Sequence, residues 1–205
     1  RSELCEHLSK ARLDVGRFDE VIRILEAWNQ TGDKTCSLLH NMAYALNSIG
    51  RSREAQSWYL RALELSENDK HTFLSYTLSL LKSGDFKQGW LHYMQRDLCT
   101  TIAGSWVTNL QRLRHNSSIA GKRVILYQEQ GFGDTLQFVR SATWLIDRGA
   151  DVTIVVPRPL RRLLAQSFPR ATVKETNPFS EEPAEGYDYA APIPDLPYIV
   201  GVVSD

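Results

Sequence analysis

The first hundred residues repeat one pattern of apolar, small and glycine positions. Gly16, Gly50 and Gly84 stand 34 residues apart. Eight residues before each glycine and nine residues after it, the chain places a large residue that is apolar or aromatic: Leu8, Met42 and Tyr76 before, Leu25, Tyr59 and Tyr93 after. A fixed period of this length indicates a solenoid, in which each unit buries its apolar face against its neighbours.

Each unit is predicted to be a pair of antiparallel helices, with the glycine at the end of the first. Glycine adopts the left-handed conformation that ends a helix without steric cost. Asp19 and Asp85 stand where the second helix begins, and they suit its positive end. The small residues Ala55 and Gly89 let the paired helices approach closely.

This pattern resembles the tetratricopeptide repeat, and residues 1–99 are expected to hold about three such helix pairs. The middle unit, residues 36–69, matches the signature best, at Leu39, Ala43, Leu46, Gly50, Ala55, Tyr59 and Ala62. The outer units depart from it at Arg12, Trp28 and Arg96. Three repeats are close to the minimum for stability, so the array is expected to continue before Arg1.

The first helix of the middle unit carries the candidate residues for partner binding. Such solenoids commonly bind a protein or peptide in a concave groove. The candidates on this helix are His40, Asn41, Tyr44 and Asn47. The alternatives are that these polar side chains are merely solvated, and that the repeats pack only against the next domain.

Residues 100–121 show no clear period and are expected to connect two domains. After them, residues 122–205 alternate short apolar runs with helical patterns. Strands are predicted at 122–127, 151–156, 171–175 and 187–193, and helices at 134–148 and 159–166. The second run is nearly continuous in Val and Ile, as in a parallel strand buried on both faces. The fold class expected is therefore α + α/β: the helical array, followed by a partial Rossmann-like lobe with a parallel sheet.

A glycine-rich turn follows the first predicted strand, in residues 128–138. Only two glycines are present where a dinucleotide site has three, and Val156-Pro157-Arg158 replaces the acidic residue expected after the second strand. The turn nevertheless lets a ligand approach the backbone, and the N–H groups of Asp134 and Thr135 are expected to be free for an anion or a hydroxyl. The candidate ligand contacts are Gln130, Gly131, Gly133, Thr135 and Gln137.

Asp134 is the candidate catalytic residue in this turn, and the residues leave two roles open. A carboxylate at a helix start can cap the helix. It can also act as a base that takes a proton from a sugar or protein hydroxyl.

Composition narrows the function classes. The chain has 24 basic and 24 acidic residues with no strongly basic half, which argues against nucleic acid. No apolar run approaches the roughly 18–20 residues needed to cross a membrane. The three cysteines and five histidines have no metal-ligand spacing, so we expect no metal site and reduced thiols in the cytoplasm. The start at Arg1, without Met and inside a helical pattern, suggests a piece of a longer protein.

Several segments together resemble bacterial tetratricopeptide-repeat proteins fused to a glycosyltransferase domain. That domain is similar to the heptosyltransferases and, more distantly, to O-linked N-acetylglucosamine transferase, which have two Rossmann-like lobes in the GT-B arrangement. The segments that carry the resemblance, in order, are Gly84-Asp85-Phe86, Gly89-Trp90, residues 93–96, Ala120-Gly121-Lys122, residues 128–138, Tyr187-Asp188 and Leu196-Pro197.

The resemblance implies sugar transfer from a nucleotide-sugar to a protein or glycan acceptor, without a required metal. The N-terminal lobe would hold the acceptor, and Asp134 matches the Asp proposed as the base. The nucleotide-sugar would bind to a second lobe of the full-length protein, so this chain is expected to have no cofactor of its own and to be inactive alone. The alternatives are a non-catalytic scaffold for protein–protein interaction and, more remotely, a nucleotide-binding regulator that uses residues 131–135.

Overall fold

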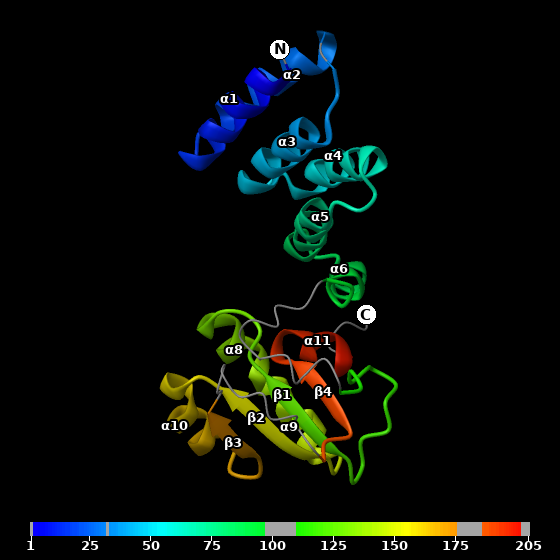
Figure 1. The fold of residues 1–205 in the computed structure, drawn as a ribbon, viewed down its shortest axis with the longest axis vertical. Coiled ribbons are helices and arrows are strands. Elements are labelled where there is room, and N and C mark those ends of the chain that lie inside the picture. The colour runs from blue at the N-terminus through cyan, green and yellow to red at the C-terminus, as the bar shows by residue number, and fades with distance from the viewer. Residues whose placement is uncertain (1, 32, 97–109, 176–185, 202–205) are drawn as a thin grey trace. The chain divides into compact units, whose positions relative to one another are not determined.

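The computed structural model describes residues 2–31, 33–96, 110–175 and 186–201 (Figure 1). The chain divides into two compact units, residues 1–96 and residues 97–205. The first is entirely helical in its described part, and the second contains a four-stranded sheet. This is the predicted fold class, a tetratricopeptide-repeat-like array followed by a partial Rossmann-like lobe.

Six helices form the three predicted pairs of the repeat array. They are α1 (Ser2–Asp14), α2 (Phe18–Thr31), α3 (Cys36–Ser48), α4 (Ser52–Leu65), α5 (Lys70–Lys82) and α6 (Phe86–Tyr93). The glycine after the first helix of each pair has a positive φ: 73° at Gly16 and 88° at Gly50 and Gly84. This is the left-handed conformation that the 34-residue period predicted.

Small and aromatic residues fit the helix pairs together as predicted. Tyr59 and Ala55 are completely buried in the core of the array. At Gly89, an added Cβ would lie 2.5 Å from Leu81 Cδ2 and 3.1 Å from the Leu81 backbone nitrogen. Because no side chain fits there, glycine is what allows α5 and α6 to pack so closely.

Side-chain hydrogen bonds join neighbouring repeats. The Asn41 amide donates to Ser9 Oγ at 2.9 Å, and His40 Nδ1 lies 2.8 Å from Thr72 Oγ1. The Thr35 hydroxyl donates to Glu6 Oε1 at 2.6 Å and also accepts from the Leu38 N–H, which caps α3. Asp85 caps α6 in the same way, as its position at the predicted helix start suggested.

The second unit is built on four parallel strands. They are β1 (Arg123–Tyr127), β2 (Asp151–Val156), β3 (Thr172–Glu175) and β4 (Tyr189–Pro192), in the spatial order β3-β2-β1-β4. The predicted strands and their parallel pairing are confirmed, although β4 is shorter at both ends than residues 187–193.

Alternate residues of these strands face two different apolar clusters. Val124 and Leu126 point to the main core, together with Leu145, Leu160 and Leu164 from the helices. Ile125 and Tyr127 point to the opposite face and are also buried. Burial on both faces explains the continuous apolar runs.

The helices of this unit follow the strands, with one departure from the prediction. Within the described residues they are α8 (Phe132–Phe138), the 3₁₀ turn η2 (Val139–Ser141), α9 (Ala142–Asp147), α10 (Arg158–Ser167), η3 (Ile193–Asp195) and α11 (Leu196–Ile199). The helix predicted over residues 134–148 is present but is not one continuous α-helix, because the 3₁₀ turn η2 separates α8 from α9. Val139, Ala142 and Leu145 are buried along this stretch and belong to the main core.

The described part of the connecting segment, residues 110–121, packs onto the sheet. Leu113 donates its N–H to the Ala190 carbonyl at 2.8 Å, and the Ala190 N–H donates to Gln111 at 2.9 Å. Leu113 is fully buried in the main core. These residues therefore belong structurally to the second unit.

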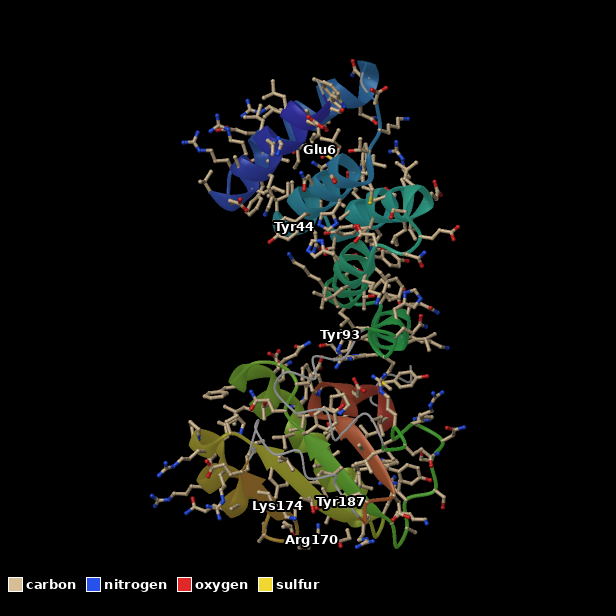
Figure 2. The ribbon with its side chains drawn as sticks, viewed as in Figure 1. Glu6, Tyr44, Tyr93, Arg170, Lys174 and Tyr187 are labelled. Atoms are coloured by element: carbon tan, nitrogen blue, oxygen red, sulfur yellow. The ribbon has the colours of Figure 1, made fainter. Side chains whose placement is uncertain are left out.

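Side-chain contacts also join β2 and β3 to the segment just before β4. Figure 2 marks Lys174 and Tyr187, whose ammonium nitrogen and hydroxyl are 3.4 Å apart, and Tyr187 also donates to Thr153 Oγ1 at 3.2 Å. Arg170 forms an ion pair with Asp147.

None of the helices in the described ranges has the length and apolarity needed to span a bilayer.

Candidate functional site

The carboxyl ends of β1 and β4 mark the place where the chain connections diverge. The connection after β1 leads to β2 on one side, whereas β4 pairs with β1 on the other. In open parallel sheets, ligands bind outside the carboxyl ends of the strands at such a switch point. Figure 1 shows α8 and α11 beside this edge of the sheet. The predicted glycine-rich turn lies here, between β1 and α8.

The two glycines of the turn leave the surface open. Neither Gly131 nor Gly133 has a positive φ, and both are exposed. A Cβ at Gly133 would meet nothing within 4 Å, and a Cβ at Gly131 would meet only Asp134 Oδ2, at 3.4 Å. The backbone conformation therefore does not require glycine, and the missing side chains leave the backbone of the turn exposed.

Asp134 is half-buried in the first turn of α8, with its carboxylate beside Gly131. The N-cap of α8 is Gly131, with φ −65° and ψ 172°, so Asp134 does not occupy the capping position. No residue in the described part of the chain forms a hydrogen bond or an ion pair with its carboxylate. The carboxylate is therefore available to a ligand.

Thr135 behaves differently from the prediction. It is buried, its N–H donates to the Gly131 carbonyl at 3.1 Å, and its hydroxyl donates to the same oxygen at 3.1 Å. The expectation that the Thr135 N–H is free for an anion is wrong, because the first helical turn has already closed on it. Thr135 instead fixes the shape of the turn.

Two buried polar residues at the end of β1 were missed from the sequence. Gln128 is 4% exposed and Glu129 3% exposed. The Gln128 amide donates to the Gln130 carbonyl at 2.6 Å, while its Oε1 is buried without a hydrogen-bond donor in the described residues. An unsatisfied buried acceptor is costly to the fold. The signal available was the direct continuation of a buried strand into two polar residues.

The remaining candidate contacts are more open. Gln130 is half-buried and Gln137 is exposed. Phe132 and Leu136 lie four residues apart on α8 and are 46% and 45% exposed, so they present apolar surface next to Asp134.

An ion pair positions the β4 side of the edge. Asp195 follows β4, is completely buried, and accepts from Arg112 Nη2 at 2.6 Å and Nε at 3.1 Å. A buried carboxylate needs such a partner to offset its lost hydration. Sequence reasoning missed this pair because the two residues are far apart along the chain.

The four groove candidates of the repeat array do not form one open surface. Tyr44 is 44% exposed, and Asn47 is half-buried and accepts from Ser52 Oγ at 2.8 Å. His40 and Asn41 are buried and engaged in the inter-repeat hydrogen bonds. Tyr44, marked in Figure 2, is thus the residue of the four that is most accessible to a partner.

Titratable groups of the array are tuned by burial. Burial, followed by the nearby His71, lowers the pKa of His40 from 6.5 to about 4. Burial likewise raises the pKa of the Cys36 thiol, which donates to Asp69 Oδ2 at 3.4 Å.

No cluster of three or more His, Cys, Asp or Glu residues within the described ranges could hold a metal ion. Cys99 lies outside those ranges.

Comparisons with known proteins give distant likenesses. No protein-family model and no curated protein matches the chain. The MamA RS-1 ArsTM double mutant aligns at 23% identity and a TM-score of 0.41, over 45% of this chain and 52% of that one. A mutant O-GlcNAc transferase from Thermobaculum terrenum aligns at 14% identity and a TM-score of 0.44, over 86% of this chain and 34% of that one. The chain thus spans about half of the first protein and a third of the second, and such loose alignments assign no activity to it.

Proposed function

We propose that this chain is the acceptor-side part of a glycosyltransferase, in which the repeats bind a protein and the sheet unit binds a protein or glycan acceptor. The observation that carries this proposal is the unengaged carboxylate of Asp134 beside an open glycine turn at the switch point of the sheet. The sequence resemblance to GT-B glycosyltransferases agrees with it.

In the proposed reaction, Asp134 is the general base. It takes the proton from the acceptor hydroxyl as that oxygen attacks the anomeric carbon of the donor sugar. The bond from the anomeric carbon to the phosphate oxygen of the donor breaks, and the nucleoside diphosphate leaves with the bonding electrons. Gly131 and Gly133 admit the acceptor to the backbone. The nucleotide-sugar would be held by a second lobe in the full-length protein.

The test is Asp134→Asn in the full-length protein, assayed for transfer from nucleotide-sugars. Loss of a general base typically lowers the rate by about 10²–10⁴-fold. Asp151→Asn, an exposed carboxylate at the amino end of β2, is the matched control and should keep full activity. If Asp134→Asn retains normal turnover, Asp134 is not the base.

The exposed ring of Tyr44 favours a second function, a non-catalytic scaffold that binds a protein or peptide through the repeats. Tyr44→Glu places a charge on this surface without removing a core contact. If it abolishes partner binding, and the full-length protein shows no sugar transfer with any nucleotide-sugar, the scaffold is the correct reading. If transfer is present, the repeats serve the enzyme.

A further inference from the structure

A groove on the sheet unit lies between α10 and β3, which are neighbours in Figure 1. Its volume is about 450 Å³, within the roughly 300–1,000 Å³ typical of small-ligand sites. The residues that line it are Arg158, Arg161, Arg162, Ala165, Gln166, Val173 and Glu175. The groove is therefore lined mainly by the cationic face of one helix.

Arg161 and Arg162 follow Arg158 by three and four residues, so both lie next to it on one side of the helix. No carboxylate in the described ranges forms an ion pair with any of them, although Glu175 lies in the same groove. Other arginines of the chain do have partners: Arg51 binds Glu54, Arg112 binds Asp195, and Arg170 binds Asp147. Within the described residues, the three guanidinium groups thus share one groove with a single carboxylate, that of Glu175, and form no ion pair with it.

The position of these arginines is electrostatically unfavourable for the chain itself. They stand in the first half of α10, whose first turn contains no acidic residue and whose N-cap, Pro157, has no side-chain cap. Cations near the positive end of a helix destabilise it. A local cost without an internal compensation is expected where a residue serves binding.

We propose that this groove binds a phosphate monoester group. Guanidinium groups form paired, charge-assisted hydrogen bonds with phosphate oxygens, and three of them suit a dianion. Glu175 would repel a second anionic group, but it can accept a hydrogen bond from a hydroxyl next to the phosphate. The lining therefore fits a phosphorylated polyhydroxy compound, such as a sugar phosphate, as well as free phosphate. The site stands independently of the transferase proposal.

Two residues of the groove, Arg158 and Glu175, lie at the carboxyl ends of β2 and β3, the sheet edge that also carries the glycine turn. Gln128 continues the pairing of β1 with β2 through its N–H, which donates to the Val155 carbonyl at 3.1 Å. The turn after β1 and the start of α10 after β2 are thus adjacent connections of neighbouring strands.

The experiment measures binding to the full chain by calorimetry, with inorganic phosphate, glucose 6-phosphate and glucose as probes. Both phosphates should bind, and glucose should not. If the hydroxyls contribute through Glu175, glucose 6-phosphate binds more tightly than phosphate, and Glu175→Ala, which removes the acceptor, abolishes that difference. Equal affinity of the two phosphates identifies free phosphate as sufficient.

Neutralising the groove supplies the matched comparison. The double variant Arg161→Gln/Arg162→Gln should weaken phosphate binding by about ten-fold or more, the loss typical of charge-assisted hydrogen bonds. Arg114→Gln, an exposed arginine outside the groove, should leave binding unchanged. Without phosphate, the double variant should melt at a temperature equal to or above that of the parent chain, because it removes cations from the helix start. Equal phosphate affinity in the double variant and the control, or no binding to the parent chain, would overturn the proposal.

Discussion

The buried His40 makes the repeat array sensitive to acid. Its ring is 8% exposed and lies 4.6 Å from the ring of His71, between centroids. Thr72 donates its hydroxyl hydrogen to Asp69 Oδ2 at 2.6 Å, so its oxygen accepts from His40 Nδ1–H at 2.8 Å. The neutral ring therefore carries its proton on Nδ1, and acidification must add the second proton to Nε2 inside the array.

The free energy involved follows from the pKa of His40. This pKa is lowered from 6.5 to about 4. Burial is the main cause, the charges of His71 and Lys10 act in the same direction, and the charge of Asp69 acts in the opposite direction. As the pH falls below 6.5, the unfolded chain binds this proton before the folded chain does, so unfolding becomes more favourable. Stability is lost from about pH 6.5 down to about pH 4. Between about pH 7.5 and about pH 5, the free energy of unfolding should fall by about 2 kcal/mol through His40 alone.

The assay is urea unfolding at these two pH values, followed by circular dichroism at the helical minimum. The parent chain is compared with His40→Gln, which removes this proton site, and with His7→Gln, which removes an exposed histidine of α1. The stability difference between the two pH values should shrink by about 2 kcal/mol in His40→Gln and stay near the parent value in His7→Gln. If His40→Gln keeps the parent's pH dependence, His40 is not a buried neutral ring and the reasoning is refuted.

Three further substitutions test the packing. Gly89→Ala should destabilise the array by about 1–3 kcal/mol in urea unfolding, because the new Cβ meets Leu81, whereas alanine would stabilise an open helix position. Thr35→Ala should cost about 1 kcal/mol through loss of the α3 cap, and Thr35→Ser should restore most of that stability. Gly133→Ala should increase the free energy of unfolding by about 0.5 kcal/mol and so raise the melting temperature slightly, because the position is helical and open. A marked destabilisation would contradict the geometry.

The repeat array could be predicted because its physical cause is local and recurs. The positive φ at Gly50 and the contact between Gly89 and Leu81 are both dictated by residue size, which the period displays directly. The destination of the polar side chains could not be predicted in this way. A polar residue on a helix reads the same whether it meets solvent or a residue of the next repeat, and only the packed array shows that His40 and Asn41 are engaged.

The parallel sheet was predictable from its apolar runs, but the site only in part. The turn and Asp134 stand out because glycines interrupt a strand–helix pattern. Thr135 was misjudged because the choice between a free N–H and a closed helical turn depends on where α8 begins, and helix starts are poorly fixed by sequence. The ion pair of Arg112 and Asp195 forms only because folding brings two distant parts of the chain together, and no local pattern in the sequence indicates that contact.

The conformation of the two glycines bears on how the turn itself should be interpreted. At Gly50, the positive φ is reason enough for glycine. Gly131 and Gly133 have no such reason, since their backbone suits other residues and a Cβ would find space. Alanine at Gly133 would even favour α8. Glycine is the less stable residue at this exposed, unstrained position, which lies next to the unengaged carboxylate. Its lack of a side chain leaves the backbone open to the close approach of a ligand. This argues that a ligand, and not the fold, accounts for the glycines beside Asp134.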